Sequence, residues 1–128
     1  MAHITPTVSP EEVFRVDKKI RWAALTSDRG EVVYCQQRPT FESFSPTLFD
    51  QEFVQLGPLT LLGTAEKYSQ YLEGVDHIVV WFGAVVGVFS RIDSQVLSVT
   101  IEKDLAVLSQ FLEWLEDRKS GTRRSGSS

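Results

Sequence analysis

Apolar and polar positions follow two patterns along the chain, one typical of β-strands and one typical of helices. Residues 20–26 and 31–37 are short apolar-rich runs, and the turn-forming stretch Ser27-Asp28-Arg29-Gly30 separates them. This spacing predicts a β-hairpin, because Asp favours turns and Gly30 can adopt a positive φ. We expect a type I turn with a G1 bulge, and we interpret Asp28 and Gly30 as structural turn residues rather than as part of a binding site.

Helical spacing appears in three stretches. Ser9-Pro10-Glu11-Glu12 is typical of a helix start, with Ser as N-cap and Glu three residues later, and the helix is expected to end near residue 17. Apolar residues three and four apart predict a long central helix over residues 48–72. Gly57-Pro58 interrupts it, so we expect two helices or a sharp kink there. A last helix is expected from Asp104 to about residue 118.

Three further strands are predicted between the central and last helices, over residues 77–82, 84–92 and 96–102. Gly83 and Asp93-Ser94 separate them, which favours an antiparallel meander. The complete order is helix-β-β-helix-β-β-β-helix. The natural solution is an α+β fold, in which helices lie on the faces of one five-stranded antiparallel sheet.

The length of 128 residues fits a single domain. We expect residues 1–8 to be a flexible leader and residues 9–119 to form the domain. Residues 120–128 are small, polar and basic, which predicts a disordered tail.

This order of elements resembles the roadblock/dynein light-chain group of the profilin-like fold, and small archaeal relatives look most similar. The features that carry the resemblance are the hairpin around "SDRG", the long central helix, the meander "HIVVWF…AVVGVFSRI…VLSVTIE" and the closing helix. The resemblance implies that the second and third strands form the two sheet edges. It also implies no catalysis, pairing with a second copy or a sister domain, and service as a platform for small GTPases.

Composition and charge narrow the classes of function. The chain is 42% hydrophobic and has a formal net charge of −4, which argues against general binding to nucleic acid. Its apolar runs are shorter than the roughly 18 residues of a membrane span, so we expect no membrane insertion. Cys35 is the single cysteine, which gives no support to an oxidising compartment, and we expect a cytoplasmic protein.

No residue pattern indicates catalysis or metal binding. His3, His77 and Cys35 are far apart in sequence and lack ligand spacing. No strand–Ser–helix elbow or phosphate-binding loop is present. We therefore expect no cofactor, no bound metal and no enzymatic activity, and we read Cys35 as a packed thiol.

The most distinctive stretch is the uncharged run from Ile78 to Phe89. An edge strand without charge or proline invites pairing with another strand, so either helices or a second chain must cover it. Large aromatic residues near this strand are typical of interfaces. The candidate dimer-interface residues are Tyr68, Tyr71, Leu72, His77, Val79, Val80 and Trp81.

Two hypotheses about function follow. The first is a non-enzymatic homodimer that binds another cytosolic protein, such as a small GTPase or another signalling partner. The alternative is a small-molecule sensing domain with a pocket between the kinked central helix and the sheet, near Gly57-Pro58.

Overall fold

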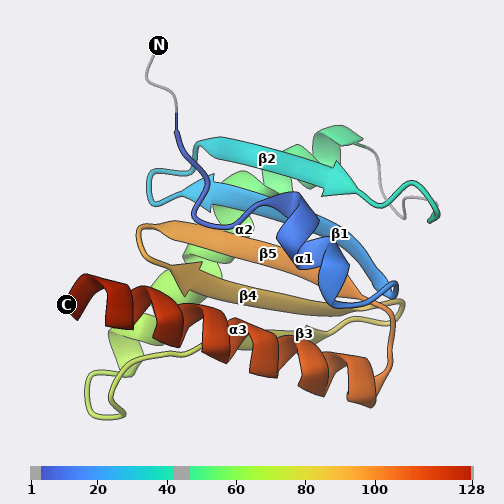
Figure 1. The fold of residues 1–128 in the computed structure, drawn as a ribbon. Helices are drawn as coiled ribbons and strands as arrows, with labels where there is room; N and C mark the ends of the chain where they lie inside the picture. The colour runs from blue at the N-terminus through green and yellow to red at the C-terminus, as the bar shows by residue number, and fades with distance from the viewer. Residues whose placement is uncertain (1–3, 42–46, 128) are drawn as a thin grey trace.

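The computed structural model describes residues 4–41 and 47–127 and has the predicted order of elements (Figure 1). The elements are α1 (Pro10–Val16), β1 (Ile20–Ser27), β2 (Val32–Gln37), α2 (Thr47–Tyr68), β3 (Ile78–Trp81), β4 (Val86–Ile92), β5 (Gln95–Ile101) and α3 (Leu105–Ser127). Each strand begins and ends within two residues of its expected position.

The five strands form one antiparallel sheet in the order β2-β1-β5-β4-β3. The α+β fold class is therefore confirmed, as is the expectation that the second and third strands lie at the edges. Helices α1 and α3 cover one face of the sheet and α2 crosses the other (Figure 1). We call these the α3 face and the α2 face.

The main core lies between the sheet and the pair α1 and α3. Phe111 and Leu115 of α3 are fully buried there against alternating residues of the central strands, such as Val88 and Val99. A smaller cluster of Trp22, Ala24 and Cys35 occupies the opposite, α2 face of β1 and β2. Alternation of side chains along the strands explains this division, because successive residues point to opposite faces.

The hairpin between β1 and β2 has the predicted geometry. Gly30 has a φ of 83°, and its N–H donates to the carbonyl of Ser27 at 3.1 Å. The Ser27 hydroxyl accepts hydrogen bonds from the N–H groups of Arg29 and Glu31, at 3.2 and 3.1 Å. Asp28 is exposed, so Ser27 supplies the side-chain support that the sequence pattern suggested for Asp28.

The expectation of a flexible leader is wrong for residues 5–8. The buried side chain of Gln95 accepts from the Thr7 N–H at 2.8 Å and donates to the Thr5 carbonyl at 2.9 Å. Arg118 donates to the Thr7 carbonyl at 2.7 Å, and the side chain of Val8 is 0% exposed. These bonds fix the segment across the end of the sheet.

Both long helices differ from the expectation. Helix α2 is one continuous helix with Pro58 inside it, not two helices, and it ends at Tyr68 rather than near Leu72. Helix α3 starts after the N-cap Asp104, whose carboxylate accepts from the N–H groups of Ala106 and Val107. It continues to Ser127, so the described part of the expected tail is helical.

Candidate interaction surface at the β3 edge

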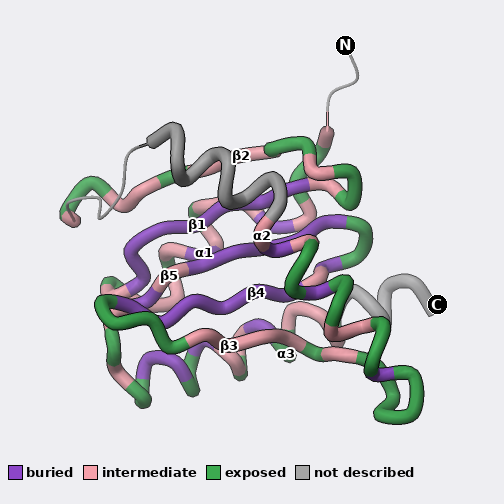
Figure 2. The backbone as a smooth tube through the Cα atoms, turned by 180° about the vertical axis from the view of Figure 1, so that it is seen from behind, coloured by how far each residue is buried: buried purple, intermediate pink, exposed green. Residues whose placement is uncertain are grey.

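Strand β3 has a neighbour on one side only, because within the described residues the sheet ends with it. Its register against β4 pairs Val79 with Val88 and Val80 with Gly87. Figure 2 shows the contrast between the buried central strands β1, β5 and β4 and the half-buried β3. One full edge of backbone is therefore available to a further strand.

The hydrogen-bond pattern identifies which backbone groups face outward. The Phe82 N–H donates to the Val85 carbonyl at 2.9 Å, so this pair occupies a hydrogen-bonded position of the hairpin. In an antiparallel ladder, hydrogen-bonded and non-hydrogen-bonded pairs alternate. Val80 therefore bonds toward β4, and the N–H and C=O groups of Val79 and Trp81 point away from the sheet.

The side chains at this edge are apolar on both faces. Val79 packs against the main core on the α3 face, and Trp81 lies on the same face with 51% of its surface exposed. Val80 and Phe82 lie on the α2 face, where Phe82 is 41% exposed. The Phe82 ring lies over Gly87, since a Cβ at residue 87 would come within 2.9 Å of the Phe82 ring carbon Cε2.

A second exposed group precedes β3. Tyr68, Tyr71 and Leu72 are 73%, 89% and 74% exposed. Only Tyr68 belongs to α2, because the other two lie in the turn that follows it. This corrects the expectation that all three lie on the central helix.

Buried Ser69 organises this turn. Its hydroxyl donates to the Glu66 carbonyl at 2.9 Å, and its carbonyl accepts from the Leu72 N–H at 2.8 Å and the Gly74 N–H at 3.3 Å. Tyr71 and Leu72 are therefore presented from a hydrogen-bonded turn rather than from a loose segment. The sequence pattern did not identify Ser69, because its role depends on where α2 ends.

Two cationic side chains hold the connection between α2 and β3 against the rest of the fold. Arg91 of β4 binds both carboxylate oxygens of Glu66, at 2.9 and 3.0 Å, and this hydrogen-bonded contact raises the pKa of the Arg91 guanidinium. Lys119 of α3 donates to the Asp76 carbonyl at 2.6 Å and to the Ser90 hydroxyl at 2.9 Å. The start of β3 is thus held from both faces of the sheet.

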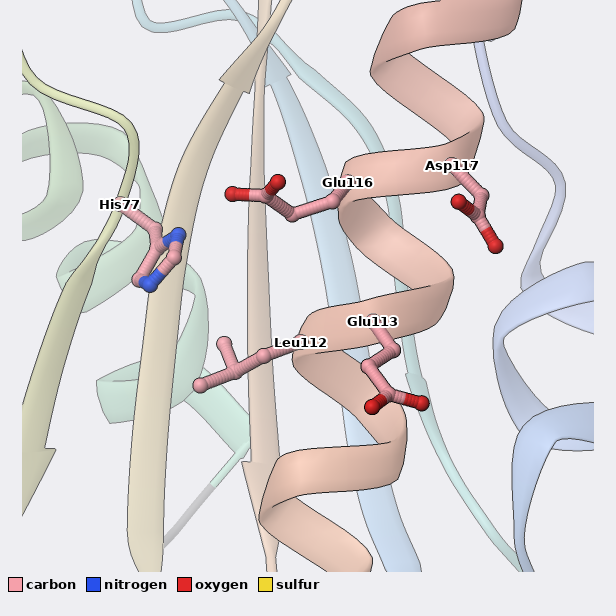
Figure 3. A pocket seen from close by; sticks show the side chains of 5 residues that line it. All are labelled: His77, Leu112, Glu113, Glu116 and Asp117. Atoms are coloured by element: carbon pink, nitrogen blue, oxygen red, sulfur yellow. The ribbon is translucent and has the colours of Figure 1, made fainter.

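His77 lies just before β3 at an open cleft of about 420 Å³. Figure 3 shows its ring directed toward the side of α3 that carries Leu112 and Glu116, while Glu113 and Asp117 lie further around the helix. Among the described residues, no group of three or more His, Cys, Asp or Glu side chains is placed to hold a metal ion. His77 borders the edge without forming a ligand set.

The opposite sheet edge, β2, is irregular. Leu25 pairs with Tyr34 but Thr26 pairs with Val32, so Val33 is an extra residue in the ladder. A bulge of this kind twists an edge and hinders pairing with another strand. Cys35 of the same strand packs against Trp22 and Ala24, as expected for a packed thiol.

A larger cleft, of about 580 Å³, lies at the C-terminal end of α2. Its lining includes Glu66, Gln70, Arg91 and Lys119, and it does not include Gly57 or Pro58. This cleft therefore does not lie near Gly57-Pro58, where the sequence suggested a ligand pocket.

Comparison with solved structures identifies the fold. The gliding protein MglB from Thermus thermophilus superposes with a TM-score of 0.67 and 12% sequence identity, over 85% of this chain and 81% of that one. A roadblock/LC7 domain from Streptomyces avermitilis gives 0.63 and 15%, over 92% and 94%. The chain has a roadblock-like fold. Myxococcus xanthus MglB gives 0.63 and 10%, over 87% and 90%.

This roadblock-like fold also matches a structure of MglB in a tetrameric arrangement, with a TM-score of 0.67 and 12% identity, over 85% of this chain and 80% of that one. No protein-family model and no curated protein sequence matches the chain. Across the described residues, no helix combines the length and apolar character needed to cross a membrane.

Proposed function

We propose that this chain is a non-enzymatic, dimeric protein-interaction domain that pairs through β3. The observation that carries the proposal is the β3 edge itself. Its outward backbone groups belong to Val79 and Trp81, its side chains are uncharged, and exposed aromatic residues lie on and beside it. A second copy supplies a strand for these groups and apolar surface for these side chains.

The β3 edge suits this role better than the β2 edge. The extra residue Val33 interrupts the β2 ladder, while the register of β3 is regular from Ile78 to Trp81. In addition, Tyr71 and Leu72 lie in the connection that leads directly into β3. We therefore assign the dimer contact to β3, the turn before it and the C-terminal end of α2, with His77 at its border.

The roadblock-like fold supports a regulatory role for the dimer. We propose a cytoplasmic platform for a small GTPase or another signalling partner, as the resemblance in the sequence implies. The tetrameric arrangement of MglB is consistent with self-association of this fold. The recognised partner is a protein rather than nucleic acid, because the net charge is −4.

Sedimentation velocity on Tyr71→Glu tests the contact at the turn. Tyr71 is 89% exposed, so the substitution leaves the isolated fold intact while placing a carboxylate in the proposed interface. Gln70→Glu is the matched control, because Gln70 is the exposed neighbour in the same turn and gains the same charge. We expect Tyr71→Glu to dissociate at least tenfold more readily than wild type and Gln70→Glu to stay near wild type. Equal dimer affinity for both variants would remove the turn from the interface.

Ligand-dependent melting distinguishes this proposal from small-molecule sensing. A ligand that binds only the folded state raises the melting temperature. We expect no metabolite or nucleotide in a screening panel to do so, because Arg91 and Lys119 at the α2 cleft already bind Glu66, Asp76 and Ser90. A reproducible increase of several degrees with one compound would favour the sensing alternative.

A further inference from the structure

Residues 5–8 lie in a groove in which the buried side chain of Gln95 binds two of their main-chain groups. The Gln95 amide donates to the Thr5 carbonyl at 2.9 Å and accepts from the Thr7 N–H at 2.8 Å. A carboxamide carries both a donor and an acceptor, so this one side chain binds two positions of a passing peptide. Pro6 between them has no N–H to satisfy, and it favours an extended conformation at Thr5.

Two more side chains complete the groove. Arg118 of α3 donates to the Thr7 carbonyl at 2.7 Å, and the Tyr34 hydroxyl of β2 donates to the Val8 carbonyl at 2.9 Å. Arg118 also binds the Glu12 carboxylate at 3.0 Å, so its position does not depend on the segment alone. The bonds to the segment reach main-chain groups, which every peptide offers. The fully buried side chain of Val8 marks one apolar pocket that selects a side chain.

The chain's own segment is an imperfect occupant of this groove. The Thr7 hydroxyl oxygen is buried and has no hydrogen-bond partner in the part of the chain that the structure describes. A buried hydroxyl that loses its bonds to water without replacement weakens the docking of the segment. Valine has the shape of threonine without the hydroxyl, so a segment with valine at this position fits the groove better.

Release of the segment leaves helix α1 in place. Ser9, which follows the segment, caps α1, because its hydroxyl accepts from the Glu12 N–H at 3.2 Å. The Glu12 carboxylate accepts in return from the Ser9 N–H at 3.4 Å. Neither bond involves residues 5–8. The helix start and the side chains that bind the segment therefore keep their places when residues 5–8 leave.

We propose that this groove is a peptide-binding site, which the chain's own residues 5–8 occupy and which a segment of a partner protein takes in exchange. The partner segment carries valine, or another β-branched apolar residue, at the position of Val8 and an apolar residue of similar size at the position of Thr7. The chain's own segment lacks the second feature, so the exchange favours the partner's sequence over that of a second copy. The groove uses no residue of β3, so this inference does not depend on the proposed dimer.

Fluorescence anisotropy with labelled hexapeptides tests the exchange on the full chain. The peptide ITPTVS copies residues 4–9, and ITPVVS has valine in place of the threonine that corresponds to Thr7. The tethered segment competes at a high effective concentration. The Val8→Ala chain, whose segment docks less well, is therefore the receptor. We expect ITPVVS to bind Val8→Ala at least tenfold more tightly than it binds wild type or the Thr5→Ala control, whose altered side chain is exposed.

The choice of peptide separates the possible occupants. ITPVAS, with alanine at the position of Val8, should bind Val8→Ala at least tenfold more weakly than ITPVVS, because it leaves the pocket empty. Equal or tighter binding of ITPTVS than of ITPVVS would make the chain's own sequence the fitting occupant and would overturn the assignment to a partner. Failure of ITPVVS to bind, or equal binding to Val8→Ala and wild type, would show that residues 5–8 are a fixed part of the fold.

Hydrogen exchange on the wild-type chain gives a second test that needs no variant. An excess of ITPVVS should displace the chain's own segment and free the Thr7 amide from Gln95. We expect the Thr7 amide to exchange at least tenfold faster with the peptide than without it. The Gly30 amide, which is bonded within the distant hairpin, is the internal control and should be unaffected. Unchanged exchange at Thr7 under a saturating excess of peptide would contradict the inference.

Discussion

Replacement of Val8 by alanine should destabilise the domain, because Val8 anchors the N-terminal segment. Its side chain is 0% exposed within the main core. The substitution removes two methyl groups, which contribute about 0.8 kcal/mol each through burial, and it leaves a small cavity with a further cost of about 1 kcal/mol. We expect the free energy of unfolding to fall by about 2.5 kcal/mol.

Urea and thermal unfolding, followed by far-UV circular dichroism at one fixed protein concentration, measure this loss. For a domain of this size, about 2.5 kcal/mol corresponds to a decrease in Tm of roughly 10 °C. Thr5→Ala is the matched control in the same segment, because the Thr5 side chain is exposed and only its carbonyl is bound by Gln95. It should change stability by less than about 0.5 kcal/mol. Equal stability of Val8→Ala and wild type would show that the segment is not packed as described.

Two further predictions concern β2 and its hairpin. Burial raises the pKa of Tyr34 well above its usual value, so the folded state retains the phenolic proton that the unfolded state loses. The contribution of Tyr34 to the free energy of unfolding should therefore be complete below about pH 10 and should decline above it by about 1 kcal/mol per pH unit. Denaturant titrations at pH 9 to 11 should show this slope in wild type and not in Tyr34→Phe. At the hairpin, Gly30→Val should cost about 1–2 kcal/mol because Gly30 has a φ of 83°, whereas Arg29→Ala should change stability by less than about 0.5 kcal/mol. Similar costs for the two hairpin variants would contradict the structural role of Gly30. Loss of partner binding in a folded Arg29→Ala protein would make the turn a site instead.

Local sequence patterns predicted the features whose interactions are local. The capping box of α1 joins Ser9 and Glu12, three residues apart, and the hairpin bonds link residues within Ser27–Glu31. The alternation of apolar runs with turn residues was sufficient to predict the order of the strands along the chain. These elements needed no knowledge of distant contacts.

The errors lie where distant residues decide the structure. The N-terminal segment is held by Gln95 and Arg118, which are 88 and 111 residues away from Thr7, and no pattern within residues 1–8 indicates this. Pro58 stays inside α2, although its missing N–H argued for an interruption there. The outward direction of Val79 and Trp81, rather than Val80, follows only from the register with β4.

The mass of the wild-type chain in solution tests the central claim most directly. Sedimentation equilibrium at micromolar concentration should give twice the chain mass of 14.5 kDa, with dissociation on dilution. The β3 edge accounts for this mass through the pairing of its outward backbone groups and the burial of Trp81. A single species of 14.5 kDa across the micromolar range would contradict both the dimer and the assignment of β3 as its contact.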